Sequence, residues 1–89
     1  MKSMENYKRK SSVSWKDLGD HIIILDSGEG KMVHHLEDVS SYLWKLLEDE
    51  QTIDSLSNKV ITEFDTSFDQ AKSDITEFIA NLQKNSLLE

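Results

Sequence analysis

Residues 31–47, with the sequence KMVHHLEDVSSYLWKLL, contain the point at which this chain changes from one structural period to another. Within residues 31–36, Met32, His34 and Leu36 occupy alternate positions, which is the two-residue period of a β-strand. From there on the apolar residues recur at helical spacing, at Val39, Leu43, Leu46 and Leu47. The sequence therefore predicts a strand that runs directly into an amphipathic helix.

Two further strands are predicted before this junction. The polar–apolar alternation around Trp15 is typical of a short strand, and residues 21–25, HIIIL, form a β-branched run without helix caps. Residues 17–20, DLGD, indicate a turn, and residues 26–30, DSGEG, suit a hairpin loop because glycine accepts positive φ. We expect an antiparallel meander with HIIIL in the middle, which places residues 31–36 at an edge of the sheet.

Three helices are predicted after the strands. The first spans residues 38–48, with Asp38 near its N-terminus, where carboxylates cap exposed N–H groups. Thr52 is the N-cap candidate of the second helix, whose buried stripe consists of Ile53, Leu56, Val60, Ile61 and Phe64. The third helix begins with a capping box of Ser67 and Gln70. Its apolar face consists of Ala71, Ile75, Phe78, Ile79 and Leu82.

These elements predict a small α+β domain over residues 13–89. It is winged-helix-like, with a three-stranded antiparallel sheet followed by three helices. Residues 1–12 are predicted to form a flexible basic N-terminal tail, since they lack apolar periodicity. We expect Leu87 and Leu88 to fold back onto the sheet, unless Leu88 and Glu89 derive from an appended tag.

The composition excludes several classes of protein. A chain of 89 residues forms one domain with a small core. It has no cysteine, which excludes disulfides, thiolate zinc sites and thiol nucleophiles. No apolar run approaches the length of about 18 residues that crosses a bilayer, and no signal peptide is visible. We therefore expect a cytoplasmic protein without a membrane partner.

The sequence contains no catalytic or metal-binding motif. His34 and His35 are adjacent on a predicted strand, so their side chains point to opposite faces and cannot chelate one ion. His21, on the neighbouring strand, still leaves a zinc ion short of three protein ligands. Neither a GxSxG motif nor a phosphate-binding glycine loop is present. We expect no metal, no cofactor and no enzymatic activity.

A winged helix is also a DNA-binding fold, which makes a DNA-binding or transcription-associated protein the alternative function. The third helix is slightly acidic and has no arginine to read guanine edges. The net charge is −7, and the first ten residues carry four basic residues against one acidic residue. The rest of the chain is therefore acidic and repels phosphate backbones, so nucleic acid is predicted to be a poor ligand.

Several segments follow a recognisable pattern. They are Val33-x-x-Leu36, LWKLL at residues 43–47, TIDSL at residues 52–56, DITEFIANL at residues 74–82, and LLE at residues 87–89. Over residues 13–89 the chain resembles the PqqD family, the peptide-binding domains also called RiPP recognition elements. It departs from the family pattern at Glu37, where asparagine is frequent, and at Ser86, where glycine is frequent.

The resemblance implies a non-catalytic peptide-binding adaptor with a winged-helix-like fold. Such domains act as chaperones that bind the leader of a ribosomally synthesised precursor peptide. They present the leader to a peptide-modifying enzyme, of radical SAM or of cyclising or peptidase type. The leader adds as a further strand to the edge of the third strand, beside the third helix. A homodimer in which two such edges pair with each other is a further hypothesis.

Two groups of binding residues follow from this reading. An edge strand offers backbone N–H and C=O groups to a visiting strand, here those of Lys31, Met32, Val33, His34, His35 and Leu36. On the third helix we assign one margin of the apolar stripe to the cleft, namely Lys72, Ile75, Thr76, Ile79 and Gln83.

Within that margin, Ile75 and Ile79 are expected to form an apolar wall, and Lys72 is the candidate partner for a leader carboxylate. Plain core packing is the alternative for Ile79. The opposite flank of the helix, with Asp74 and Asn81, is the less favoured choice. Trp44 is expected in the core rather than on a binding surface, because large aromatic side chains dominate small cores.

Overall fold

The computed structural model describes residues 6–25 and 33–89. Its elements are, in chain order, β1 (Ser14–Asp17), β2 (His21–Leu25), β3 (Val33–Glu37), α1 (Val39–Leu46), α2 (Ile53–Glu63) and α3 (Phe68–Lys84). This confirms the predicted α+β domain with three strands followed by three helices. The predicted strand residues Lys31 and Met32, and the loop at residues 26–30, lie outside the described residues.

The sheet is antiparallel with the order β1-β2-β3. The middle position of β2 confirms the prediction from its sequence, because the side chains of Ile22 and Ile24 are completely buried. The turn between β1 and β2 also forms as predicted. There the N–H of Gly19 donates to Oδ1 of Asp17 at 2.9 Å, and Gly19 has a φ of 99°. Strand β3 pairs only with β2 among the described strands, and it is therefore an edge.

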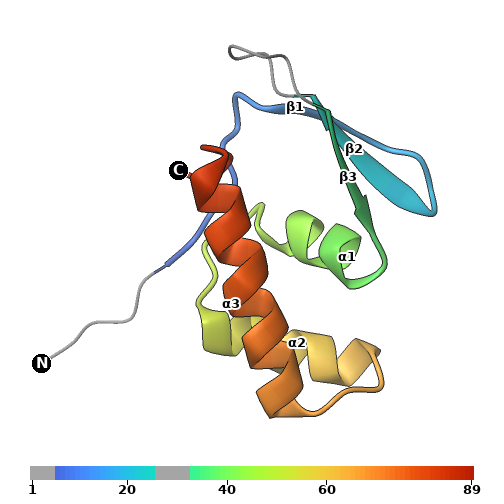
Figure 1. The fold of residues 1–89 in the computed structure, drawn as a ribbon, viewed down its shortest axis with the longest axis vertical. Coiled ribbons are helices and arrows are strands. Elements are labelled where there is room, and N and C mark those ends of the chain that lie inside the picture. The colour runs from blue at the N-terminus through green and yellow to red at the C-terminus, as the bar shows by residue number, and fades with distance from the viewer. Residues whose placement is uncertain (1–5, 26–32) are drawn as a thin grey trace, which may run out of the picture.

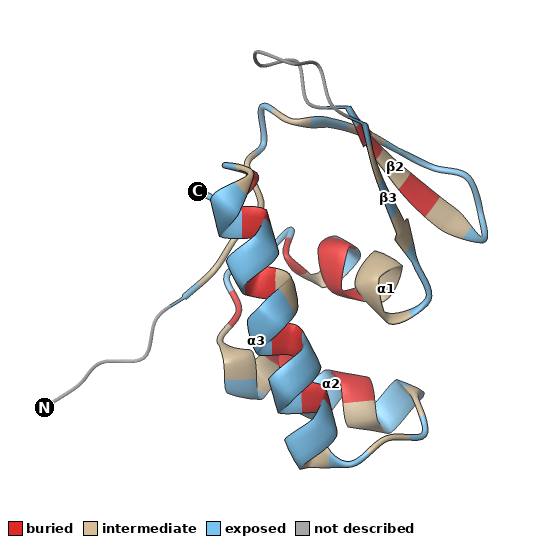
Figure 2. Cartoon of the chain, viewed as in Figure 1, coloured by how far each residue is buried: buried red, intermediate tan, exposed pale blue. Residues whose placement is uncertain are grey.

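The core lies between one face of the sheet and the helices. Helix α1 packs against β3 and α2, and α2 packs against α3 (Figure 1). Trp44 of α1 is completely buried, as predicted, and the ring of Trp15 from β1 meets it edge-on, with centroids 6.3 Å apart. The buried residues follow the inner sides of the helices, whereas the outer sides of α2 and α3 are exposed (Figure 2).

The helix ends differ in detail from the predicted caps. The side chain of Ser67 accepts the N–H of Gln70, but the Gln70 side chain donates to Asp74, so only half of the predicted box forms. The complete capping box lies at α2, between Thr52 and Ser55. Asp38 makes no capping hydrogen bond. Its φ of 52° is left-handed, whereas an N-cap side chain reaches back from extended backbone.

The N-terminal segment is docked where we expected a flexible tail. The backbone of Tyr7 exchanges hydrogen bonds of 2.7 and 2.9 Å with Gln51, and the N–H of Arg9 donates to the Leu47 carbonyl at 2.9 Å. The prediction is therefore wrong for residues 7–10. The N–H groups of Tyr7, Arg9 and Lys10 donate to the carbonyl oxygens of Gln51, Leu47 and Leu87, which gives the segment specific partners.

The C-terminal residues lie beside the N-terminal segment, and the N–H of Glu89 donates to the Lys8 carbonyl at 2.8 Å. Leu87 and Leu88 are buried, in agreement with the expectation that they fold back. Leu88 forms an isolated bridge with Arg9 rather than pairing with a strand of the sheet. No helix in residues 6–25 and 33–89 is long and apolar enough to span a membrane.

Candidate functional site

The outer edge of β3 is the first component of the candidate site. Its backbone directions follow from the β1–β2 hairpin, where the N–H of Leu18 donates to the His21 carbonyl at 2.9 Å. In an antiparallel pair the hydrogen-bonded positions alternate. His21, Ile23 and Leu25 therefore direct their backbone groups to β1. The residues between them, Ile22 and Ile24, direct their N–H and C=O groups to β3.

The register between β2 and β3 carries this alternation to the edge. Ile22 lies opposite Leu36, and Ile24 lies opposite His34. Leu36 and His34 therefore use their backbone groups in the ladder with β2. The intervening residues direct their N–H and C=O groups away from the sheet; these are Val33, His35 and Glu37. The edge thus presents three outward backbone positions at a two-residue spacing.

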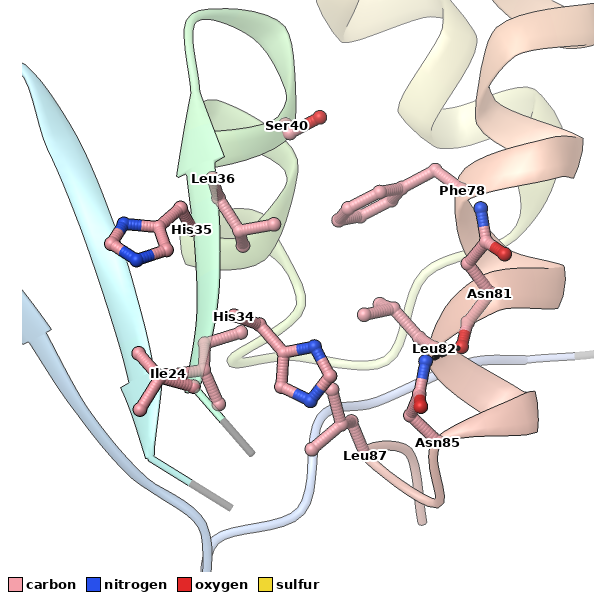
Figure 3. Close-up of a pocket in the computed structure, with 11 residues that line it drawn as sticks. Ile24, His34, His35, Leu36, Ser40, Phe78, Asn81, Leu82, Asn85 and Leu87 are labelled. Atoms are coloured by element: carbon pink, nitrogen blue, oxygen red, sulfur yellow. Dashed lines mark hydrogen bonds between the residues drawn. The ribbon is translucent and has the colours of Figure 1, made fainter. Parts of the chain in front are cut away.

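A groove separates this edge from α3. Its volume is about 420 Å³, which is within the range of small-ligand sites. It is lined by Ile24, Val33, His34, His35, Leu36, Ser40, Phe78, Asn81, Leu82, Asn85 and Leu87. The side chains of His34 and Leu36 point from β3 toward α3, and Phe78 and Leu82 point back toward them (Figure 3). The groove therefore has an apolar centre, with the amides of Asn81 and Asn85 along its α3 side.

A second hollow continues the groove past the C-terminal end of β3. Its volume is about 310 Å³, and it is lined by Val39, Ser40, Leu43, Asp74, Glu77, Phe78 and Asn81. Ser40, Phe78 and Asn81 line both spaces, so the two lie next to each other. We call this hollow the acidic pocket, because Asp74 and Glu77 are its charged residues.

The structure places the predicted α3 margin away from the groove. Lys72 Nζ lies 3.5 Å from Asp54 Oδ1 of α2, which puts this side of α3 next to α2. Ile75 and Ile79 are buried in the core. None of the five predicted residues of α3 lines the groove or the acidic pocket; these were Lys72, Ile75, Thr76, Ile79 and Gln83. The opposite flank, with Asp74 and Asn81, borders these two spaces instead.

The groove side of α3 can be recognised in the sequence by its spacing. Phe78, Asn81, Leu82 and Asn85 follow the spacing i, i+3, i+4, i+7, so they share one helix face. Two of them are apolar and two are amides, which makes this face suitable for contact with an extended chain. Phe78 and Leu82 had been assigned to the core stripe alone.

A Schellman turn at the end of α3 shapes one end of the groove. The N–H of Leu87 donates to the Leu82 carbonyl at 2.9 Å, and the N–H of Ser86 donates to the Gln83 carbonyl at 3.0 Å. Ser86 has a φ of 59°, the left-handed conformation that this motif requires. The turn brings Leu87 back against Leu82, and both side chains line the groove.

The histidines lie on different faces, as the alternation predicted. His34 faces the groove, whereas His35 points to the other face of the sheet (Figure 3). The ring of His35 stacks on that of His21, with centroids 6.2 Å apart. Within residues 6–25 and 33–89, no cluster of three or more histidine, aspartate or glutamate side chains could hold a metal ion.

Comparisons with known proteins agree with this architecture. The PqqD family, described as coenzyme PQQ synthesis protein D, matches residues 21–88. A solved structure titled "TbiB1 in Complex with the TbiA(beta) Leader Peptide" shares the fold with a TM-score of 0.81 at 22% sequence identity. The similarity covers 92% of this chain and 94% of that one. No curated protein matches the chain. Because the family match spans most of its length, including β2, β3 and all three helices, this chain belongs to the PqqD family.

Proposed function

We propose that this chain is a peptide-binding adaptor that captures the leader of a ribosomally synthesised precursor peptide by strand addition to β3. One observation carries the proposal: β3 is an edge strand whose outward backbone groups border a groove shared with α3. Membership of the PqqD family supports it, as does the fold shared with TbiB1, whose structure holds a leader peptide.

Strand addition uses the outward backbone groups of Val33, His35 and Glu37. A visiting strand satisfies them with main-chain hydrogen bonds, which provide affinity with little dependence on sequence. Met32 and Lys31 continue the proposed peptide-binding strand in the sequence. Selectivity then depends on the side chains of the visitor that point inward.

Alternate side chains of an added strand point to the same face of the sheet. Those on the inner face would enter the groove between β3 and α3, against the apolar side chains of Leu36, Phe78, Leu82 and Leu87. The amide of Asn81 is placed to bond polar groups of the visitor, whereas Nδ2 of Asn85 already donates to the Asn81 carbonyl at 2.9 Å, which leaves Oδ1 of Asn85 as an acceptor. Ile75 and Ile79 support this wall from the core, so they contribute to its shape rather than to direct contact.

In this proposal the chain performs no chemistry of its own. It holds the leader while an enzyme of radical SAM, cyclising or peptidase type acts on the remainder of the precursor. A leader bound by its backbone leaves the rest of the precursor accessible, which is what presentation to a second protein requires. The visiting strand and a second copy of β3 compete for the same edge, so the peptide-binding form is a monomer at that edge.

Selection from a display library of random linear peptides, followed by titration of labelled binders, tests the proposal. Val33→Pro removes one outward N–H and should weaken binding by at least about tenfold. Val33→Thr keeps the N–H and the β-branched shape, so it serves as the matched control and should bind like the original chain. Val33 is half exposed, so neither change opens a core cavity.

Circular dichroism and the dispersion of amide signals check that the proline variant is folded. Unchanged affinity in a folded Val33→Pro variant would falsify strand addition at β3. A library that yields no binder, or a chain that sediments as a dimer at concentrations where it should bind peptide, would also contradict the proposal.

A further inference from the structure

The acidic pocket extends the groove in a direction that the strand β3 does not reach. It begins at Ser40, Phe78 and Asn81, which it shares with the groove, and it continues along α3 toward the N-terminus of that helix. Because Val39 and Ser40, just after the C-terminal end of β3, line the pocket, a peptide that pairs with β3 and extends beyond this end would reach it. Asp74 and Glu77, its two charged residues, determine the charge of the group that the pocket can bind.

Asp74 and Glu77 are three residues apart on α3, so they lie side by side on one helix face. Both are exposed to solvent. Oδ1 of Asp74 accepts a hydrogen bond of 2.9 Å from Nε2 of Gln70, a neutral donor that leaves the negative charge in place. Within the described part of the chain, no lysine or arginine forms an ion pair with either carboxylate.

The described walls around these carboxylates carry no positive charge. Within residues 6–25 and 33–89, no lysine or arginine lines the groove or the acidic pocket. Lys72 of the same helix is turned toward Asp54 of α2. A cation brought by a bound peptide would therefore meet two carboxylates that form no ion pair with a described residue, beside the apolar ring of Phe78.

The direction of the visiting strand decides which end of it reaches this pocket. Strand β3 runs from Val33 to Glu37 and ends beside the acidic pocket. Antiparallel strand pairs outnumber parallel pairs two- to three-fold. An antiparallel visitor has its N-terminal end at the C-terminal end of β3, so the residues that precede its paired segment lie over the pocket.

We infer that this chain selects peptides with a lysine or arginine just N-terminal to the segment that pairs with β3, held by Asp74 and Glu77. The inference rests on the proposed function, because it names the peptide class that the same groove accepts. The long stem of either basic residue would lie along Phe78 while its charged end reaches the carboxylates.

The test uses peptides selected from the random library on the full chain. Among them, lysine or arginine should be enriched on the N-terminal side of the paired segment. Replacing that residue by glutamine in one selected peptide should weaken binding to the original chain by about three- to tenfold, and less at high salt. The D74N/E77Q variant should bind both peptides equally.

The E48Q/D49N variant is the matched control. It neutralises one aspartate and one glutamate, as D74N/E77Q does, but at exposed positions just beyond α1 that line neither hollow. It should discriminate between the two peptides as well as the original chain does. Equal loss of discrimination in the control would assign the effect to net charge and overturn the inference.

Two other results overturn the inference and leave the proposed function intact. In the first, the selected peptides pair with β3 but show no enrichment of basic residues N-terminal to the paired segment, or show it only on the C-terminal side. In the second, D74N/E77Q discriminates between the two peptides as the original chain does. Selected peptides that bind without changing the amide signals of β3 contradict both the proposed function and the inference.

Discussion

The guanidinium carbon of Arg9 lies 4.8 Å from the centroid of the Trp15 ring, which places a cation over an aromatic face of the first strand. It also lies 5.7 Å from the ring of Trp44. Its Nη1 donates to the carbonyl oxygens of Trp44 and Lys45 at 2.9 and 3.2 Å. Because these carbonyls belong to the last turn of α1, Arg9 both caps the helix and neutralises its negative end.

Replacing Arg9 by alanine is therefore predicted to destabilise the fold. The loss combines a cation–π contact, hydrogen bonds from a charged group and a favourable interaction with the helix dipole. We expect the free energy of unfolding in urea to fall by about 1–2 kcal/mol. Lys16→Ala, which removes an exposed positive charge from β1, should change it by less than about 0.5 kcal/mol. Equal stability of Arg9→Ala and the original chain would show that the Arg9 side chain does not stabilise the end of α1.

Ser86→Gly is predicted to stabilise the protein. Ser86 occupies the left-handed position of the Schellman turn with a φ of 59°, a conformation that glycine adopts without steric cost. We expect a gain of about 0.5–1 kcal/mol in thermal or urea unfolding. The same exchange at Ser73, which is exposed within α3, should instead cost about 0.5 kcal/mol. Opposite signs for the same substitution within α3 and just beyond its end test the turn geometry, and a loss of stability at Ser86 contradicts it.

The pair between Asp17 and Lys45 makes stability depend on pH in the acid range. Lys45 Nζ lies 2.9 Å from Asp17 Oδ2, and this hydrogen bond, with that from the Gly19 N–H, lowers the pKa of Asp17 below 3.8. A depressed pKa contributes stability that is present above 3.8 and is lost as the pH falls through the lower folded value. Asp17→Asn should therefore lower the free energy of unfolding at neutral pH. In acid, the free energies of unfolding of the variant and the original chain should become more similar.

Urea unfolding at neutral pH and below pH 3.8 measures this difference. The effect is expected to be small, because the pair is partly exposed and screened by solvent. Glu50→Gln removes one negative charge at an exposed position, so it is the control for the change in net charge. A difference between Asp17→Asn and the original chain that stays constant across this range would contradict the assignment.

Much of the fold could be predicted from periodicity. The alternation around His34 and the β-branched run at residues 21–25 identify two strands, because each pattern matches one buried sheet face. The helices follow from their apolar stripes. Asp38 departs from its predicted role, since the chain reverses sharply between β3 and α1 and the local backbone overrides capping preference.

The flank of α3 that borders the groove could not be decided in the same way. A helical stripe identifies which residues face the core, but its two margins are equivalent until the position of β3 is known. The ion pair between Lys72 and Asp54 shows that one flank of α3 lies next to α2. The packing of α3 on α2 therefore determines which flank is left to border the groove. Docking of residues 7–10 was likewise hidden, because the partners are backbone carbonyls distant in sequence and carry no side-chain pattern.

Amide hydrogen exchange along β3, measured with and without a library-selected peptide, decides whether the peptide adds to this strand. The peptide should slow exchange at Val33, His35 and Glu37, whose N–H groups point outward, and should leave His34 and Leu36 unchanged, since these already pair with β2. Slowing that appears only on other elements, while the three outward amides exchange as fast as in the peptide-free protein, would contradict strand addition at this edge.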